Sequence, residues 1–475
     1  MKYLIAIFFL QSLFILDAQE NKIDLKNDPL KGYVYEDDLL TKEFHKNRRD
    51  ALRKLMPENS VAVFFTNPIR NRSNDVDYEY HQDPNFYYLT GYHEPHGVLL
   101  IFKETQNFDS IQTNEILIVQ EKDPSSEIWT GKRLGKKGAE TLLGFELVFN
   151  NTEFKDLAFD LKSFNVILAF PNESDERDFQ NETADLHDLK KLFYNTINLQ
   201  NASKKLDVKN LDKLMSKLRQ VKLNEELILL KKAIDITCEA QIELMKALNP
   251  EMKEYQTEAL VEYVFKKNGA EYPGFPSIQG SGENSCVLHY TTNRKPLKGN
   301  ELLVSDIGAE YHGYTADVTR TLPTDGKFSE EEKIIYNIVL EAQNAGINKC
   351  KPGNKFWDPH LAATNVIAKR LLELGIIKNE FQVQKYFMHG TSHYLGLDVH
   401  DAGLYGILEI GNVITVEPGI YIPEGSDCDP KWWNIGVRIE DDILITDNEP
   451  VNLSEKAPRT IEEIEKTMQM ESFYK

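Results

Sequence analysis

The sequence predicts two domains, an α/β domain followed by a larger α+β domain. The chain has 475 residues, which are too many for one ordinary hydrophobic core. In the first half, short apolar segments of strand length alternate with helical stretches. The second half opens with long amphipathic helices and continues as short strands between glycine-rich turns.

The composition excludes several classes of protein. With 41% hydrophobic and 27% charged residues, the chain is typical of a globular protein and not of a disordered one. A net charge of −20 without a basic stripe argues against nucleic-acid binding. The 4 cysteines form no C-x-x-C pair, so a zinc knuckle is not indicated.

Residues 1–18 have the pattern of a signal peptide. Lys2 precedes an apolar run at 3–16, and cleavage is expected after Ala18. The run is too short for a comfortable membrane-spanning helix. A buried first helix is the alternative. We expect an exported protein, periplasmic or secreted, whose mature form has no membrane span.

Residues 19–214 form the predicted α/β domain. A basic helix is expected at 41–55, followed by a buried strand at 61–65. Further strands are predicted at 86–89, 97–102 and 115–119. A polar segment at 172–209 then leads to a domain boundary near Leu214.

Residues 215–460 form the predicted α+β domain, and 461–475 form a C-terminal tail. Apolar residues recur at helical spacing from Leu227 to Leu248, where Asn224 is expected to cap the helix and Asn249-Pro250 to end it. Further helices are expected at 255–267, 330–344 and 360–374, with short strands from Ser277 onward.

A short hairpin in the second domain carries two aspartates. Asp306 follows an apolar strand, and Asp317 lies on the returning segment after Gly313. If the chain reverses between Tyr311 and His312, the two aspartates face each other with β-carbons about 4.5–5.5 Å apart. Carboxylates at that distance repel each other unless a cation lies between them. A surface hairpin with two ordinary aspartates is the alternative.

A second cluster contains three of the chain's 11 histidines, His389, His393 and His400. The spacing of the first two imitates the H-E-x-x-H zinc helix, but Gly390 replaces the glutamate, so that motif is rejected. Glycines and small residues surround all three histidines, which favours a site over a continuous helix. Structural histidines are the alternative.

Two glutamates follow on strand-like segments. Glu417 ends an apolar strand, and Glu440 alternates with Val437 and Ile439 so that it shares a face with Arg438. Each glutamate alone is more typical of a solvated strand residue. Together, four carboxylates and one imidazole suit manganese, cobalt or ferrous iron better than a closed structural zinc site.

These segments resemble the pita-bread metallopeptidases of family M24, and within them the Xaa-Pro aminopeptidases, or aminopeptidase P. The matching motifs are GSGENSCVLHYT, LLVSDIGAEYHGYTADVTRTLP, FMHGTSHYLGLDVHD, VITVEPGIY and GVRIEDD. HQDPNFYYLTGYHEP and EIWTGKRLG are similar to the family's N-terminal domain, so the resemblance covers nearly the whole mature chain. It implies a C-terminal pita-bread (creatinase/aminopeptidase) domain preceded by an aminopeptidase P-like α/β domain.

The resemblance also implies a metal site. Two divalent ions would bind there, first of all Mn2+, with Co2+ or Zn2+ as alternatives. Asp317 and Glu440 would bridge the two ions, and a hydroxide held between them would attack the scissile bond. The five ligands of the family pattern correspond to Asp306, Asp317, His393, Glu417 and Glu440.

Further roles follow from the same resemblance. Glu417 would pass a proton to the departing proline nitrogen, and Arg438 would hold carboxylates in place. His289, His389 and His400 would orient the peptide, with Tyr421 close by. The expected partner is a peptide with proline at its second position, and we expect a homo-oligomer.

Two other functions stay open. A prolidase-like Xaa-Pro dipeptidase shares the fold and the five ligands. A non-catalytic binding protein on the same fold is the alternative from another class, although such proteins usually lack some ligands. Methionine aminopeptidases are disfavoured by the large first domain, and creatinases by the complete ligand set.

Overall fold

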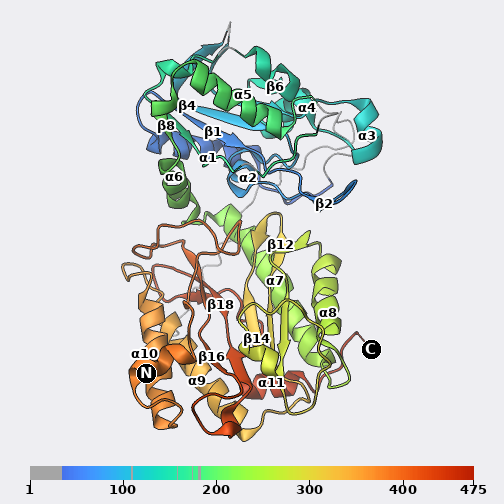
Figure 1. Cartoon of the computed structure of the whole chain (residues 1–475), viewed down its shortest axis with the longest axis vertical. Helices are drawn as coiled ribbons and strands as arrows, with labels where there is room; N and C mark the ends of the chain where they lie inside the picture. Colours follow the sequence, from blue (N-terminus) through green and yellow to red (C-terminus); the bar gives the residue numbers. More distant parts are fainter. Residues whose placement is uncertain (1–34, 109–110, 158, 174, 180–182, 475) are drawn as a thin grey trace, which may run out of the picture.

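A computed structural model describes residues 35–108, 111–157, 159–173, 175–179 and 183–474. The predicted signal peptide therefore lies outside the described residues. Figure 1 shows two domains stacked along the long axis of the molecule, the first in blue to green and the second in yellow to red. The described part of the chain contains no helix that is both long and apolar enough to cross a membrane.

The first domain is built on a six-stranded mixed sheet with the strand order β6-β5-β4-β1-β7-β8. The central strand β1 pairs antiparallel with β4 and parallel with β7. The strands are β1 (Ser60–Phe65), β4 (Val98–Phe108), β5 (Ile111–Val119), β6 (Val148–Asn150), β7 (Val166–Ala169) and β8 (Leu206–Asp207), and a small separate hairpin is formed by β2 (Asn71–Ser73) and β3 (Val76–Asp77).

Helices cover both faces of this sheet. Val61 and Val63 pack into the cluster that contains α5, whereas Ala62 and Phe64 pack into the cluster that contains α1. This alternation is the period of two that a strand buried on both faces requires. The helices are α1 (Lys42–Leu55), α2 (Pro84–Thr90), α3 (Pro124–Thr130), α4 (Gly135–Gly138), α5 (Leu186–Leu199) and α6 (Asn210–Arg219). The predicted α/β domain and its first helix are confirmed.

The strand predicted at 86–89 was wrong, because these residues belong to helix α2. The carboxylate of Asp83 accepts a hydrogen bond from the Phe86 amide at 2.8 Å, and Pro84 stands in the first turn. Both features start a helix. All the aromatic residues that follow are buried, and a short run of that kind fits a strand and a buried helix equally well.

The second domain combines long helices with small antiparallel sheets, as expected for an α+β domain. The sheets have the orders β10-β11-β14, β13-β12-β9, β15-β18-β19 and β16-β17. The helices are α7 (Asn224–Ala247), α8 (Glu254–Lys267), α9 (Glu330–Ile347), α10 (Asp358–Glu373) and α11 (Ile461–Thr467). The strands are β9 (Tyr272–Pro273), β10 (Ile278–Ser281), β11 (Leu302–Ile307), β12 (Ala309–Tyr311), β13 (Tyr314–Thr315), β14 (Val318–Pro323), β15 (Val413–Val416), β16 (Gly419–Ile422), β17 (Ile435–Arg438), β18 (Asp441–Leu444) and β19 (Val451–Asn452).

The predicted cap of α7 was wrong. Asn224 is the first helical residue, and the Leu223 amide donates to the Glu226 carboxylate at 2.9 Å. A glutamate three residues after the cap position can satisfy that amide through its own side chain, so asparagine is not needed at the preceding position.

The aspartate hairpin forms, but its register differs from the predicted one. Asp306 pairs with Thr319, and Tyr311 pairs with Tyr314. The turn residues His312 and Gly313 both have positive φ, at 49° and 84°, as a two-residue hairpin turn of type I′ requires. The reversal therefore lies one residue later than predicted. Because the shift moves each partner by two residues, both aspartates stay on the same face.

The connection between the domains is fixed to the loop that carries His400. The side chains of Arg219, at the end of α6, and of Lys222 both donate to the Asp401 carboxylate, which is buried. Arg219 also donates to Asn85 of the first domain at 2.8 Å. The linker, the first domain and the His400 loop thus share one buried hydrogen-bonded cluster.

Candidate metal centre

The five predicted metal ligands come from five places in the second domain, two of them on the aspartate hairpin. Asp306 lies in β11, and Asp317 lies between β13 and β14. His393 lies between α10 and β15, Glu417 follows β15, and Glu440 separates β17 from β18. One ligand atom each from Asp317, His393 and Glu440 lies within 4.8 Å of the other two. The fold therefore brings together residues that are far apart in the sequence.

His393 directs one ring nitrogen into the cluster. Its Nε2 lies 3.3 Å from Asp317 Oδ2 and 3.6 Å from Glu417 Oε1. Its Nδ1 lies 3.0 Å from the carbonyl oxygen of Tyr394, so Nδ1 carries the proton and donates it. The lone pair of Nε2 then faces the carboxylates, which is the arrangement that a metal-binding histidine needs.

Arg438 connects Asp306 to the rest of the site. It donates to Asp306 Oδ2 at 2.7 Å, to the Tyr421 hydroxyl at 3.0 Å and to the Thr319 hydroxyl at 3.2 Å. The Thr319 hydroxyl in turn donates to Glu440 Oε2 at 2.7 Å. Arg438 alternates along its strand with core residue Val437, as the period of two predicts.

The electrostatics of the cluster call for a cation. Burial raises the pKa of Asp317 well above its usual value, and the negative charge of Asp306 raises it further. Burial likewise raises the pKa of Glu440 well above its usual value, and the negative charge of Asp317 adds to this effect. Oδ1 of Asp306 and Oδ1 of Asp317 are buried without a hydrogen-bond partner among the described residues. Buried carboxylates without partners are costly unless a cation neutralises them, so divalent metal ions fit this donor set.

The three substrate-side histidines lie in different environments. His389 Nε2 lies 2.8 Å from the Tyr421 hydroxyl, and its Nδ1 lies 2.7 Å from the Gly390 carbonyl. Burial lowers the pKa of His389 to about 4, so its ring is neutral. His400 and His289 are exposed, and neither forms a hydrogen bond with another described residue. The ring centroid of His400 lies 4.4 Å from that of His393.

Two residues of the site were not found from the sequence. Thr319 bonds both Arg438 and Glu440, and the buried Asp442 accepts a hydrogen bond from the Asp317 amide at 3.3 Å. The pairing of Thr319 with Asp306 across the hairpin was the only available signal, and the predicted register obscured it.

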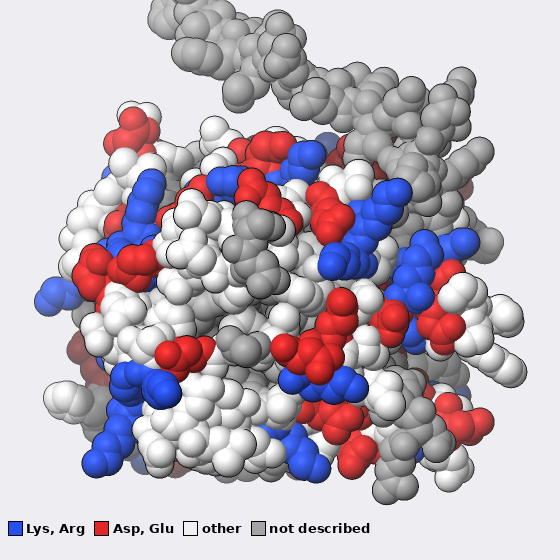
Figure 2. Space-filling view, turned by 90° about the horizontal axis from the view of Figure 1, so that it is seen from above, with Lys and Arg blue, Asp and Glu red and all other residues white. Residues whose placement is uncertain are grey.

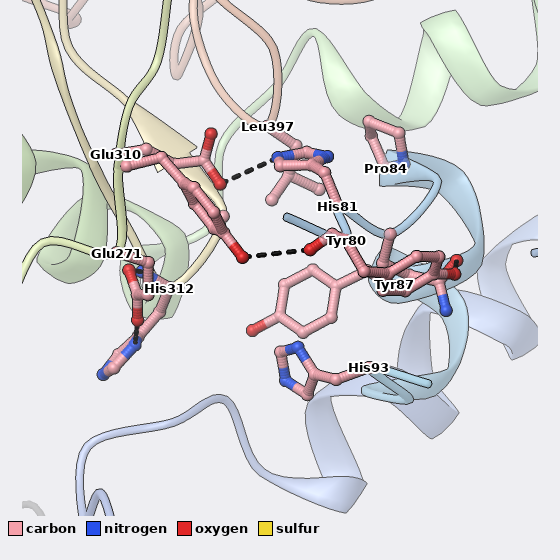
Figure 3. A pocket seen from close by; sticks show the side chains of 12 residues that line it. Tyr80, His81, Pro84, Tyr87, His93, Glu271, Glu310, His312 and Leu397 are labelled. Atoms are coloured by element: carbon pink, nitrogen blue, oxygen red, sulfur yellow. Dashed lines mark hydrogen bonds and ion pairs between the residues drawn. The ribbon is translucent and has the colours of Figure 1, made fainter. Parts of the chain in front are cut away.

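A separate pocket of about 150 Å³ lies between the two domains, and none of the predicted site residues line it. Figure 3 shows His81 against Glu310 and His312 against Glu271, with the ring of Tyr87 projecting into the pocket above His93. The two ion pairs measure 2.8 and 2.7 Å, and His312 Nε2 also lies 2.8 Å from Asp38 Oδ1. The contacts of Glu310 with His81 and of His312 with Asp38 hold the tip of the aspartate hairpin to the first domain, and Glu271 fixes His312 from within the second domain.

Comparisons with known proteins agree with this site. Residues 228–447 match metallopeptidase family M24, and residues 45–165 match the aminopeptidase P N-terminal domain. The buried carboxylate and histidine cluster lies within the first match. The protein is therefore a metallopeptidase, and its fold is the pita-bread fold preceded by an aminopeptidase P N-terminal domain.

Similar proteins indicate which kind of metallopeptidase this chain is. The Xaa-Pro aminopeptidase of Escherichia coli is 35% identical, with 90% of this chain and 98% of that protein covered. Human Xaa-Pro aminopeptidase 3 is 33% identical, with 85% and 80% covered. The structure of Pseudomonas aeruginosa aminopeptidase PepP matches with a TM-score of 0.82 at 32% identity, covering 90% of this chain and 98% of that one. The chain belongs to the aminopeptidase P family of Xaa-Pro aminopeptidases.

Proposed function

We propose that this protein is an aminopeptidase that releases the N-terminal residue from peptides whose second residue is proline. The observation that carries the proposal is the buried cluster of Asp317, His393 and Glu440, with Asp306 and Glu417 beside it. Such a cluster, on a chain that resembles Xaa-Pro aminopeptidases over most of its length, supports catalysis and not only binding.

We propose that two divalent ions bind at these five residues, and that Mn2+ is the preferred metal because oxygen ligands dominate the set. When bound, such ions supply an activated water and polarise the scissile carbonyl. Asp317 and Glu440 would hold metal together with His393, since one ligand atom of each of these residues lies within 4.8 Å of the other two. Arg438 keeps Asp306 oriented.

Glu417 is the proposed proton carrier. Burial raises the pKa of Glu417 to about 7. A carboxyl group with a pKa near neutrality can accept a proton from the attacking water and then donate it to the proline nitrogen. The Glu417 amide donates to the Thr391 carbonyl at 2.9 Å, which fixes the position of this residue at the end of β15.

We propose separate roles in substrate binding and catalysis for the three substrate-side histidines. His389 is held between Tyr421 and the Gly390 carbonyl, so it forms a rigid wall of the site. The ring nitrogens of His400 and His289 have no hydrogen-bond partner among the described residues, so they can donate to the carbonyl oxygen as negative charge develops there. The Xaa-Pro amide has no N–H and a fixed ring, so a pocket shaped for that ring can position the bond.

We further propose that the protein is exported after cleavage at Ala18 and forms a homo-oligomer. The basic residue and short apolar run at the start of the sequence support export. Figure 2 shows acidic and basic side chains intermixed over one face of the first domain, which agrees with the absence of a nucleic-acid surface there.

A peptide panel on metal-reconstituted protein tests the activity. We would compare Gly-Pro, Gly-Pro-Ala, a longer Gly-Pro peptide, acetylated Gly-Pro-Ala and Gly-Ala-Ala by mass spectrometry. The proposal predicts free glycine from the tripeptide and the longer peptide, and little from the acetylated peptide or Gly-Ala-Ala. Cleavage of Gly-Pro alone would identify a dipeptidase. No cleavage of any peptide by the parent, or equal cleavage by a Glu417→Gln variant, would contradict the proposal.

A further inference from the structure

A row of aromatic rings connects the surface of the second domain with the site. Trp357 stands directly before α10 and is 53% exposed. Its ring centroid lies 5.7 Å from that of His360, which lies 5.5 Å from Phe387, and Phe387 lies 5.1 Å from His389. Phe387 is buried, whereas Trp357 faces solvent. The outermost ring of the row is thus a half-exposed indole.

The backbone next to His389 confirms how close Trp357 lies to the site. A β-carbon placed on Gly390 would be 4.0 Å from the Trp357 ring atom Cζ3. His360 Nδ1 lies 2.9 Å from the Thr391 hydroxyl, and the Thr391 carbonyl accepts the Glu417 amide. Trp357 therefore lies against the segment that carries His389 and fixes Glu417.

Other apolar side chains near this indole are also exposed. Leu361 lies one helical turn after Trp357 and is 57% exposed, and Met388, next to His389, is 47% exposed. Residues four apart on a helix are neighbours on its surface. All three side chains thus lie on segments that adjoin the site, and exposed apolar side chains at such a place are typical of a binding surface, because their exposure contributes nothing to folding.

We propose that Trp357, Leu361 and Met388 form a binding surface for the part of the peptide beyond the proline, and that it takes apolar or aromatic side chains. This inference rests on the proposed function. An aminopeptidase substrate has only one residue before the scissile bond, so any surface that extends away from the site meets the departing side of the peptide. The flat indole can stack on a proline ring or an aromatic ring.

Kinetics of paired peptides test the surface. Gly-Pro-Leu-Phe and Gly-Pro-Gly-Gly would be compared in the parent, Trp357→Ala, Trp357→Phe and Met388→Ser. Trp357→Ala is expected to raise KM for Gly-Pro-Leu-Phe about tenfold with kcat nearly unchanged, and to leave Gly-Pro-Gly-Gly unaffected. Trp357→Phe should restore most of the loss, and Phe381→Ala is the control, since Phe381 is exposed in the same domain and has no ring contact with another described residue.

A binding measurement separates this inference from the proposed activity. Calorimetry would give the affinity of the product-like peptides Pro-Leu-Phe and Pro-Gly-Gly for the same variants. Weaker binding of Pro-Leu-Phe alone to Trp357→Ala supports the surface even if the parent cleaves no Gly-Pro peptide. Equal effects on both peptides, or no effect on either, would overturn it. A changed preference for the residue before proline would also overturn it, because the indole would then contact the other side of the bond.

Discussion

Replacing Arg219 by methionine removes the main cation from the cluster that joins the linker to the His400 loop. Arg219 donates to Asp401 and, at 3.1 Å, to Asp398. The side chains of Arg219 and Asp401 are only 3% and 1% exposed. Methionine keeps most of the apolar stem of arginine but not its charge. Asp401 is then left with Lys222, whose Nζ lies 2.7 Å from Oδ2.

The expected loss of stability in Arg219→Met follows from the burial of the ion pair that it breaks. Removing one partner of a buried ion pair costs about 3–5 kcal/mol, because the other charge stays without compensation. Lys222 still neutralises Asp401, so we expect the lower end, about 3 kcal/mol. The matched control is Lys378→Met, which breaks an ion pair whose side chains are 71% and 69% exposed. That loss should stay below about 1 kcal/mol.

Urea unfolding, followed by tryptophan fluorescence and circular dichroism, measures both free energies of unfolding. The double variant Arg219→Met/Asp398→Asn should recover part of the loss, since the charges that remain in the cluster, those of Lys222 and Asp401, then neutralise each other. Turnover by Arg219→Met should also fall, because His400 precedes Asp401 in the loop. If Arg219→Met costs no more than Lys378→Met, the cluster does not hold this loop and the reasoning is refuted.

Three further predictions concern the site and the interface. Asp317→Asn should lower both the amount of bound metal and the activity. It should nevertheless stabilise the metal-free protein at pH 7.5 by about 1 kcal/mol or more, since it removes one of the repelling charges. A loss of stability in the metal-free protein would contradict this prediction. His400→Ala should slow turnover about 10²-fold with the metal retained, as measured by elemental analysis and steady-state rates; lost metal would instead mean that His400 is a ligand. The hydrogen bond to Glu310 raises the pKa of His81, and the carboxylates of Glu271 and Asp38 raise that of His312 against the effect of burial. A raised histidine pKa gives stability that is fully present below about pH 6.5 and is lost as the pH rises through the higher folded pKa. Urea midpoints at pH 6 and 8 should therefore differ less in the double variant His81→Gln/His312→Gln than in the parent.

The fold class and the elements around the site could be predicted from the sequence because their signals are local. The alternation that places Arg438 and Glu440 on one face depends only on neighbouring residues. The hairpin register depends on the torsion angles of His312 and Gly313, and the sequence alone does not distinguish a turn centred on these residues from one placed one residue earlier.

Contacts between distant segments could not be predicted. The double role of Thr319 arises only where β14 packs beside β17, and the ion pairs of Arg219 arise only when the linker meets the His400 loop. Thr319 lies within one of the family motifs, but nothing in the local pattern singles out its hydroxyl, and Arg219 belongs to none of these motifs. The roles of the five metal ligands and of the substrate-side histidines stay predictions, and so do the predicted domain boundaries and the cleavage site.

The contacts across the domain interface limit how the protein can be cut into fragments. A catalytic fragment that began at Asn224, the first residue of α7, would lack both cations that neutralise Asp401. It would also lack His81, the partner of Glu310 at the tip of the hairpin. Such a fragment would contain every proposed metal ligand and still leave Asp401 and Glu310 without the ion-pair partners that they have in the whole chain. A fragment that keeps the site in order must therefore include residues before α7, although every proposed metal ligand lies after them.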